Sequence, residues 1–160
     1  MRLLICPILL VVPILAKAQA QNLTTGDLRL EGSVAFTEGP AWHPSGNVYF
    51  TDIANNRIMR RDPKGTMHVF RTPSGRANGL LFDQSGRLMA CEGGGEGGNR
   101  RVTRTEEDGT ITVLAERYQG KRLNSPNDLA VDSKGRIYFS DPRYGNRTDL
   151  EQFDDHGKEI

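Results

Sequence analysis

Apolar and polar residues alternate in short runs along the chain, with turn signals about every eight to twelve residues. Alternation with a period of two is typical of half-buried β-strands, and no segment carries a persuasive helical period. The pattern predicts four strands in a first unit, at residues 39–43, 47–53, 57–61 and 66–72. A second unit repeats that order at 79–83, 87–92, 101–105 and 110–116, and a third begins with 128–131 and 136–140.

The three units align on a turn glycine, which indicates an internal repeat. Gly46, Gly86 and Gly135 follow the first predicted strand of each unit, at spacings of 40 and 49 residues. Four antiparallel strands repeating at roughly this period are typical of a β-propeller blade. A β-sandwich is the competing all-β architecture, but it does not require the same order of strand, turn and polar residue in each unit. We therefore expect an all-β protein with a β-propeller fold.

The number of repeats is smaller than a closed ring requires. Propellers typically have about four to eight blades, whereas residues 37–160 supply about two and a half. Within the N-terminal segment 21–36, residues 28–36 predict an extra strand of the kind that completes a last blade and closes the ring. The sequence ends in a polar stretch, residues 152–160, in which no strand is predicted. The sequence thus predicts a truncated propeller, a fragment or a truncated product, with exposed strand edges in its last blade.

Residues 1–20 predict a secretory signal peptide rather than part of the fold. Arg2 precedes an apolar run from Leu3 to Leu15, and Ala18-Gln19-Ala20 provides the small residues that signal peptidase reads. The run is too short to span a bilayer and contains Pro7 and Pro13. We expect cleavage after Ala20 and a secreted or periplasmic protein.

Charge and cysteine content narrow the functional classes. Removal of the signal peptide takes away Arg2 and Lys17, so the net charge falls from +1 to −1. A near-neutral chain with interspersed charges lacks the cluster of positive charge with which proteins bind nucleic acid or an anionic membrane. The processed chain keeps one cysteine, Cys91, so it forms no intramolecular disulfide, and we interpret Cys91 as a small strand residue.

Each unit carries an oxygen-bearing side chain eight residues before its turn glycine, namely Glu38, Asn78 and Asn127. Equivalent positions of successive blades converge on a propeller axis, so one carboxylate and two amide carbonyls are expected to meet there. Oxygen ligands of this kind suit Ca²⁺ or another divalent cation. Structural interpretations stay open: Glu38 as a solvated loop residue, Asn127 as an Asx-turn residue, and Asn78 as part of an Asn-Gly turn. Asn78 is the least specific of the three.

Acidic residues also recur at the end of the second strand of each unit, as Asp52, Glu92 and Asp141. Their repetition indicates a structural role, in which the carboxylate accepts hydrogen bonds from amides of the following loop. A second metal site is the alternative.

Other motifs exclude several chemistries. The glycine run 93–98 lacks the Gly-Lys-Ser/Thr ending of a phosphate-binding loop, so we interpret it as a flexible connection at the mouth of the propeller channel. The sequence contains neither HExxH nor Gly-x-Ser-x-Gly, which leaves zincin chemistry and Ser-His-Asp hydrolysis without support.

At the repeated motifs the chain resembles the SMP-30/gluconolactonase/LRE-like family of six-bladed propellers. EGPAWHPSGNVYFTDI from Glu38, ANGLLFDQSGRL from Ala77 and NSPNDLAVDSKGRIYFSDPRYG from Asn124 are similar to secreted bacterial gluconolactonases. The combination of EGP with SPND in sequential blades is the most specific part of a resemblance that runs from about Thr37 to Tyr144.

The resemblance implies a divalent cation, usually Ca²⁺, on the propeller axis with Glu38 and Asn127 among its ligands. It implies contacts of Ser125 and Asp128 with a sugar lactone. A further asparagine ligand and a general-base aspartate are expected beyond Ile160, and Asp128 is a second candidate for that base. The favoured function is calcium-dependent hydrolysis of a sugar lactone by the intact protein.

Two other functional hypotheses remain open. The chain could belong to a non-catalytic propeller that binds a ligand or protein and holds a structural metal, or the 160-residue product could have no function of its own. The sequence makes no prediction of the oligomeric state.

Overall fold

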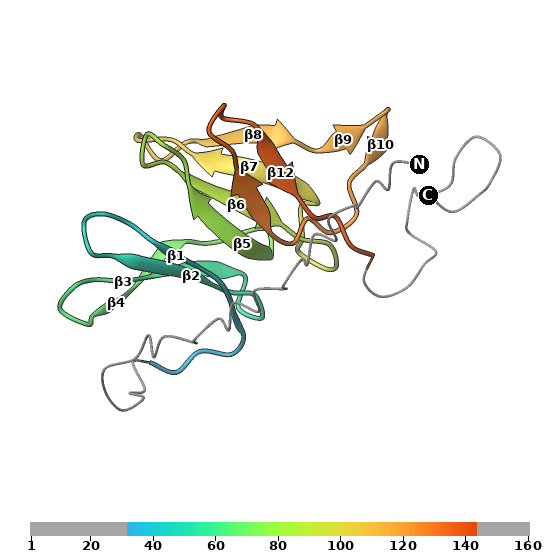
Figure 1. Ribbon diagram of the computed structural model, residues 1–160. Helices are drawn as coiled ribbons and strands as arrows, with labels where there is room; N and C mark the ends of the chain where they lie inside the picture. Colours follow the sequence, from blue (N-terminus) through green and yellow to red (C-terminus); the bar gives the residue numbers. More distant parts are fainter. Residues whose placement is uncertain (1–31, 144–160) are drawn as a thin grey trace, which may run out of the picture. The chain divides into compact units, whose positions relative to one another are not determined.

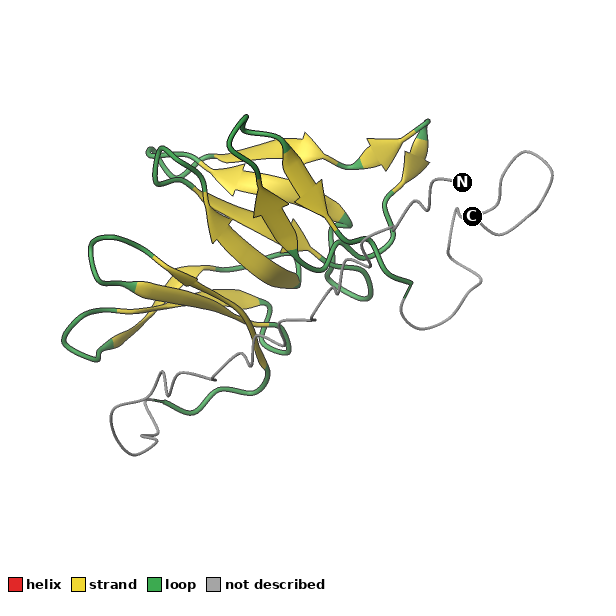
Figure 2. Cartoon of the chain, in the orientation of Figure 1, coloured by secondary structure: helices red, strands yellow, loops and turns green. Residues whose placement is uncertain are grey.

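Residues 32–143 are described by a computed structural model, and they form strands and turns without a helix (Figures 1 and 2). Within this range no helix is long and apolar enough to cross a membrane. The predicted signal peptide, residues 1–20, lies outside the described residues, as does the polar stretch 152–160. The strand predicted at 28–36 is wrong for its described part, because residues 32–36 form no strand.

Two four-stranded antiparallel sheets follow the predicted repeat. In the first, the strands lie in chain order as β1 (Thr37–Trp42), β2 (Val48–Asp52), β3 (Arg57–Arg61) and β4 (Met67–Arg71). The second has the same order, with β5 (Ala77–Phe82), β6 (Leu88–Glu92), β7 (Arg101–Thr105) and β8 (Ile111–Ala115). A two-stranded sheet of β11 (Leu129–Val131) and β12 (Ile137–Phe139) starts the third repeat. The all-β propeller prediction is confirmed as two blades and the first hairpin of a third.

A further hairpin between β8 and β11 was not predicted. It consists of β9 (Arg117–Tyr118) and β10 (Lys121–Arg122), which pair antiparallel. Gln119 and Gly120 form its turn with φ values of 49° and 81°, the left-handed pair that a tight two-residue hairpin requires.

The turn glycines that define the repeat are required by backbone geometry. Gly86 and Gly135 have φ values of 77° and 76°, and their amides donate to the carbonyls of Asp83 and Asp132. The Asp83 carboxylate also accepts the amides of Ser85 and Arg87, each at 2.9 Å. Each turn is therefore closed by hydrogen bonds between its own residues. Because the turn depends on these few neighbouring residues, the repeat can be recognised in the sequence.

Packing between the blades follows the two-residue period of β6, all of whose residues are buried. Leu88 and Ala90 pack with residues of the first blade, whereas Met89 and Cys91 pack towards the third repeat with Leu129. The first cluster comprises Ala41, Tyr49, Ile58, Ala77, Leu80, Leu88 and Ala90, with Phe82 packed against it. In Figure 1 the sheet of β5–β8 accordingly lies between β1–β4 and the β11–β12 hairpin.

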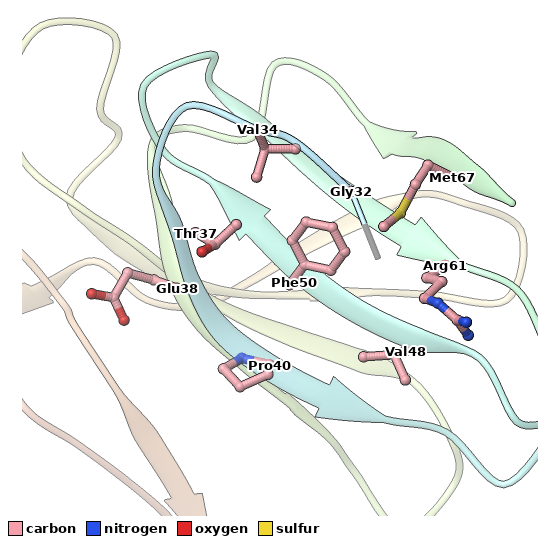
Figure 3. Close-up of a pocket in the computed structure, with 9 residues that line it drawn as sticks. All are labelled: Gly32, Val34, Thr37, Glu38, Pro40, Val48, Phe50, Arg61 and Met67. Carbon is pink, nitrogen blue, oxygen red and sulfur yellow. The ribbon is translucent and has the colours of Figure 1, made fainter. Parts of the chain in front are cut away.

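The opposite face of the first blade is apolar and hollow (Figure 3). The hollow has a volume of about 700 Å³, with Glu38 at one end and Arg61 at the other. Its floor contains Phe50 and Val48, which alternate with the inward-facing Tyr49. Within the described residues no sheet covers this face. A neighbouring blade covers such a face in a closed propeller, so we assign the hollow to blade packing rather than to substrate binding.

Candidate metal and lactone site

The first strands of the three repeats lie side by side at the positions singled out in the sequence. The Thr51 hydroxyl donates to the carbonyl oxygen of Asn78 at 3.1 Å, and the amide of Gly79 donates to the carbonyl oxygen of Asn127 at 2.6 Å. These bonds connect the first repeat to the second and the second to the third. The main chains at Glu38, Asn78 and Asn127 are therefore neighbours across two successive blade junctions.

Glycine makes this close approach sterically allowed. A Cβ atom on Gly39 would lie 2.1 Å from the Asn78 carbonyl oxygen, and one on Gly79 would lie 2.6 Å from the Asn127 carbonyl oxygen. Real Cβ atoms do not come so near to backbone, so each glycine following the polar residue lets the next blade pack directly against the strand.

Local irregularity shapes the same stretch of β1 and β5. Pairing of β1 with β2 is regular at Thr37 and Glu38 and resumes only at Ala41, while β5 skips from Ala77 to Leu80. Gly39 has a φ of 50°, and Pro40 has no amide hydrogen to offer to a sheet ladder. Such bulges redirect side chains, and this one occurs at the predicted ligand positions in both blades.

The three side chains fit part of the coordination sphere of a hard cation. Glu38 is exposed, and Asn78 and Asn127 are half-buried, so their side chains are not sealed within the core. Together they offer one carboxylate and two amide oxygens, whereas Ca²⁺ takes about six to eight oxygen ligands. Within residues 32–143 no group of three or more His, Cys, Asp and Glu side chains gathers. A site here would thus depend on the asparagine oxygens and on ligands from elsewhere.

Asp141 holds the segment that contains Ser125 and Asn127. Its carboxylate accepts the backbone amides of Asn124, at 2.8 and 2.9 Å, and of Ser125, at 2.8 Å. Asp52 similarly accepts the amide of Phe36, at 3.3 Å. The predicted structural role is confirmed in part. The side-chain amides of Asn55 and Asn99, in the loops after β2 and β6, donate to Asp52 at 2.8 Å and to Glu92 at 2.6 Å. The backbone amides bound by Asp52 and Asp141 instead precede the first strand of the repeat.

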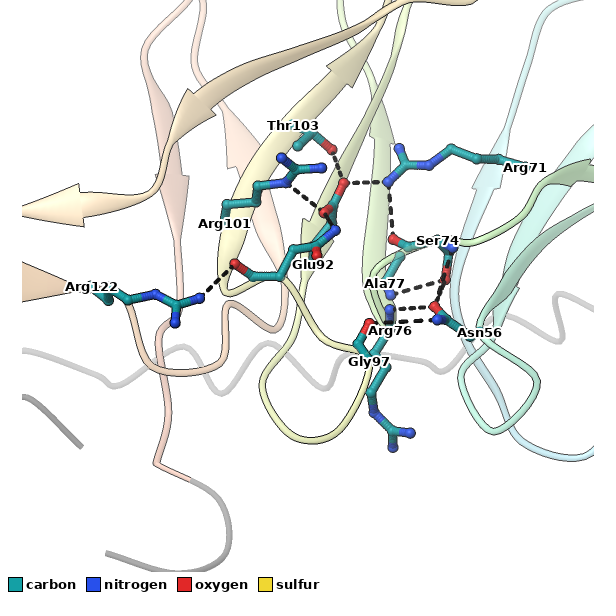
Figure 4. A network of polar contacts seen from close by, with 11 residues as sticks. Asn56, Arg71, Ser74, Arg76, Ala77, Glu92, Gly97, Arg101, Thr103 and Arg122 are labelled. Atoms are coloured by element: carbon teal, nitrogen blue, oxygen red, sulfur yellow. Dashed lines mark hydrogen bonds and ion pairs between the residues drawn. The ribbon is translucent and has the colours of Figure 1, made fainter. Parts of the chain in front are cut away.

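Glu92, the third acid of this set, is fully buried and binds side chains instead (Figure 4). It forms an ion pair with Arg71 and accepts hydrogen bonds from Arg101 at 2.7 Å, Asn99 at 2.6 Å and Thr103 at 2.8 Å. Burial alone would raise the pKa of Glu92, but the hydrogen bonds from Arg101 and Asn99 and the charge of Arg71 outweigh it and lower the pKa. A carboxylate so fully engaged by donors serves the packing of the blades and leaves a second metal site there without support.

The glycine run after β6 contacts both the second and the third repeat, and its interpretation as a flexible connection stays a prediction. The amide of Gly93 donates to the carbonyl of Arg76, and the amide of Gly94 donates to the hydroxyl oxygen of Ser125 at 2.9 Å. A Cβ on Gly94 would lie 2.9 Å from the Asn124 carbonyl oxygen. Because glycine has no side chain, the loop can lie against residues 124–125.

Asp128 takes the place that glycine has in the first two repeats, directly after the predicted ligand. Its Oδ1 accepts the amide of Leu129 at 2.9 Å and lies 2.6 Å from where a Cβ on Gly79 would be. The side chain is exposed. Asp128 thus presents a carboxylate where its equivalents Gly39 and Gly79 present only main chain.

Two residues that support this region were missed in the sequence. Asn56 accepts the amides of Ser74 and Arg76 with its side-chain oxygen, at 3.2 and 2.7 Å, and Arg100 donates to carbonyls of residues 123 and 124. Both have left-handed backbones, with φ values of 50° and 57°. Asn often adopts this conformation, so Asn55-Asn56 gave a local hint, whereas Arg100 gave none.

Comparison with known families decides the assignment. The SMP-30/gluconolactonase/LRE-like region matches residues 36–157 of the sequence. The chain belongs to the SMP-30/gluconolactonase/LRE-like family. The predicted resemblance is thereby confirmed.

Two curated relatives are named for lactone hydrolysis. A gluconolactonase of Zymomonas mobilis is 30% identical over 140 residues, which cover 78% of this chain and 38% of the relative. A pentonolactonase of Haloferax volcanii is 29% identical over 114 residues, covering 68% of this chain and 35% of the relative. The chain thus spans less than half of the length of these SMP-30/gluconolactonase/LRE-like relatives.

Solved structures agree with the family fold. A gluconolactonase of Xanthomonas campestris superposes with a TM-score of 0.65 at 38% identity, over 72% of this chain and 38% of that chain. A virginiamycin B lyase of Staphylococcus aureus superposes with a TM-score of 0.52 at 23% identity, over 70% of this chain and 36% of that chain, and shows the fold alone.

Proposed function

We propose that this chain supplies part of the site of a calcium-dependent sugar lactonase. The observation that carries the proposal is the stacking of β1, β5 and β11, which makes neighbours of the main chains at Glu38, Asn78 and Asn127. The names of the family relatives, a gluconolactonase and a pentonolactonase, support the substrate class. The proposed reaction is hydrolysis of a cyclic carboxylic ester.

In this proposal Glu38 and Asn127 hold a divalent cation, Ca²⁺ in the first instance, and Asn78 is a further ligand or supports one. A bound cation would polarise the lactone carbonyl and favour the negative charge that develops on its oxygen. Neutral asparagine ligands leave that positive charge largely uncompensated. Glu38 supplies the one carboxylate of the three and anchors the cation electrostatically.

The neighbouring residues orient the substrate. Ser125 lies half-buried beside Asn127, and its hydroxyl can donate to a sugar oxygen while its oxygen accepts the Gly94 amide. Water adds to the lactone carbonyl carbon, the ring C–O bond breaks, and the proton lost by water ends on the released hydroxyl. A carboxylate must accept that proton in transit. Asp128 is the candidate for this role within the chain.

The cation assignment is tested by titrating Ca²⁺ into the purified chain in a calorimeter. Glu38→Gln and Asn127→Ala are expected to weaken binding, whereas Glu107→Gln, in an exposed turn, serves as the matched control. Unchanged affinity in both site variants would remove Glu38 and Asn127 from the ligand set.

The lactonase assignment is tested by following acid release from glucono-lactone and a pentono-lactone, with and without a chelator. We expect chelator-sensitive hydrolysis that Glu38→Gln abolishes. A cation-loaded protein that leaves a panel of lactones and esters intact would instead identify a binding propeller with a structural metal.

We also propose export, supported by Ala18-Gln19-Ala20 and the apolar run before it. Expression of the full sequence in a bacterial host should yield extracytoplasmic protein whose N-terminus is Gln21. Protein retained in the cytoplasm with an intact N-terminus would contradict this assignment.

A further inference from the structure

Residues 123–127 are held by contacts from two repeats. In the second repeat, Gly79 of β5 donates its amide to the Asn127 carbonyl and Glu116, after β8, accepts the Leu123 amide. Other contacts from the second repeat come from the glycine loop after β6. Arg100, at the end of the glycine loop, donates its Nε–H to the carbonyl oxygens of Leu123 at 2.6 Å and Asn124 at 3.1 Å. From the same loop, the Gly94 amide donates to the Ser125 hydroxyl oxygen at 2.9 Å. The loop therefore engages both the main chain and a side chain of this segment.

The third repeat holds the same segment through its amides. Asp141 accepts the amides of Asn124 and Ser125, and the carbonyl of Ser140 accepts the amide of Asn127 at 3.0 Å. The carbonyls of Leu123 and Asn124 thus accept from the Arg100 guanidinium of the second repeat, and the amides of Asn124 and Ser125 donate to the Asp141 carboxylate of the third. Rotation of these peptide planes would break bonds on both sides at once.

Arg100 is placed for this task by an uncommon backbone. Its φ of 57° is left-handed, a region that non-glycine residues seldom occupy, and its amide donates to the carbonyl of Gly93. Gly98 completes the fold of the loop, because a Cβ there would lie 2.4 Å from the Gly93 carbonyl oxygen. The loop conformation consequently directs the guanidinium towards residues 123 and 124.

We propose that Arg100 is a positioning residue, which acts through the Leu123 and Asn124 carbonyls to fix the orientation of Ser125 and Asn127. This inference rests on the proposed function, since it assigns Asn127 to a cation and Ser125 to the substrate. Arg100 itself contacts neither. Partners bonded directly to a metal ligand typically change metal affinity by about 10- to 100-fold when they are removed, and Arg100, which acts through the main chain, is expected at the lower end of that range.

The test uses Arg100→Gly, which removes the guanidinium while glycine adopts the left-handed backbone without strain. Arg76→Gly is a matched control, because Arg76 is also left-handed, with φ of 54°, and no described contact of its side chain reaches residues 123–127. Both variants relieve a left-handed non-glycine backbone, but only Arg100→Gly also removes hydrogen bonds to the main chain, so it should be the less stable of the two. Only Arg100→Gly is expected to weaken Ca²⁺ binding, on the order of tenfold by calorimetry, and Arg100→Lys should restore part of it. Equal affinity in the Arg100 and Arg76 variants would overturn the proposal.

Amide hydrogen exchange of the cation-free chain separates this inference from the proposed function. Arg100→Gly should accelerate exchange at Ser125 and Asn127, whereas Arg76→Gly should not. If the unmodified chain binds no Ca²⁺, the proposed metal role fails, but the exchange rates still decide whether Arg100 holds the segment. Unaltered exchange at both amides would refute the positioning role directly.

Gly94→Ala provides an independent variant that removes no charge. Its new Cβ would press on the Asn124 carbonyl oxygen at 2.9 Å without requiring a left-handed backbone, so the segment must shift. We expect faster exchange at Ser125 and weaker Ca²⁺ binding here too. Binding as tight as in the parent chain would show that the position of the segment does not matter to the cation.

Discussion

Arg71, the last residue of β4, donates to the buried carboxylate of Glu92, the last residue of β6, and so links the first blade to the second. The same Arg71 nitrogen donates to the carbonyl of Ser74 at 2.9 Å, within the connection between the two blades (Figure 4). Glu92 also accepts bonds from Arg101 and Thr103 of its own blade. One carboxylate therefore couples the strand ends of one sheet to the neighbouring sheet.

Replacement of Glu92 by Gln should destabilise the fold strongly. The change leaves Arg71 and Arg101 facing a neutral group, and loss of one partner of a buried ion pair typically costs about 3–5 kcal/mol. Urea unfolding would measure the loss in the free energy of unfolding. Glu107→Gln in an exposed turn is the control, and equal midpoints for the two variants would contradict a coupling role for Glu92.

Stability should fall in acid, and Glu92 should contribute to the loss. The pKa of Glu92 is lowered from 4.5 by its donors, and a hydrogen bond from His68 with backbone amides lowers the pKa of Asp62 to about 2. A group with a lowered pKa in the fold stabilises it fully above its unfolded pKa, and this stabilisation is lost as pH falls through the folded value. Unfolding free energy should therefore decline below about pH 4.5.

The pH dependence is checked by urea unfolding between pH 7 and pH 3 in the parent chain and in Glu92→Gln. The variant should show a shallower slope below the pKa of an ordinary glutamate. Parallel curves would assign the acid loss to other carboxylates.

Alanine at Gly39 or Gly79 should disrupt the junctions between repeats. The added Cβ would collide with the main chain of Asn78 or Asn127, and overpacking of this kind typically costs about 1–3 kcal/mol. Gly109→Ala is the control for Gly39→Ala, since both glycines are left-handed, with φ of 83° and 50°, but a Cβ on Gly109 has open space. If these two variants unfold at the same urea concentration, the loss at Gly39 reflects backbone conformation alone and not contact between blades.

Cys91 should be unreactive in the folded protein. It is fully buried, and burial, together with the negative charges of Asp128 and Asp141, raises the pKa of its thiol to about 12. Thiolates, rather than thiols, react with disulfide reagents. In a chain carrying Cys6→Ser, reaction with such a reagent at pH 8 should appear only as urea unfolds the protein. Rapid reaction without urea would mean that β6 is accessible.

The strands were predictable where local chemistry determines them. Residues 57–61 and 101–105 were predicted with the same bounds as β3 and β7, because each leads into a turn closed by its own aspartate or glutamate and glycine. The main-chain proximity of Glu38, Asn78 and Asn127 followed from the repeat. Whether these residues bind a cation stays a prediction.

Features that depend on contacts between distant residues could not be read from the pattern. The contacts of the glycine run with Asn124 and Ser125 could not be read from the sequence, because Ser125 lies 31 residues after Gly94, beyond β7–β10. Arg100 carried no motif, since its role depends on a left-handed backbone and a segment of the next repeat. The β9–β10 hairpin was missed because two residues per strand are too few to show a period.

The glycines at positions 39 and 79 have a consequence for how such a protein can diversify. Contact between the inner strands is made by main chain, so the bore of a channel lined by them is set by the backbone rather than by the residues that face it. Exchange of a polar side chain at position 38, 78 or 127 would then alter which molecule is held without moving the main chain around it. Geometry and chemical preference can evolve separately in such an architecture.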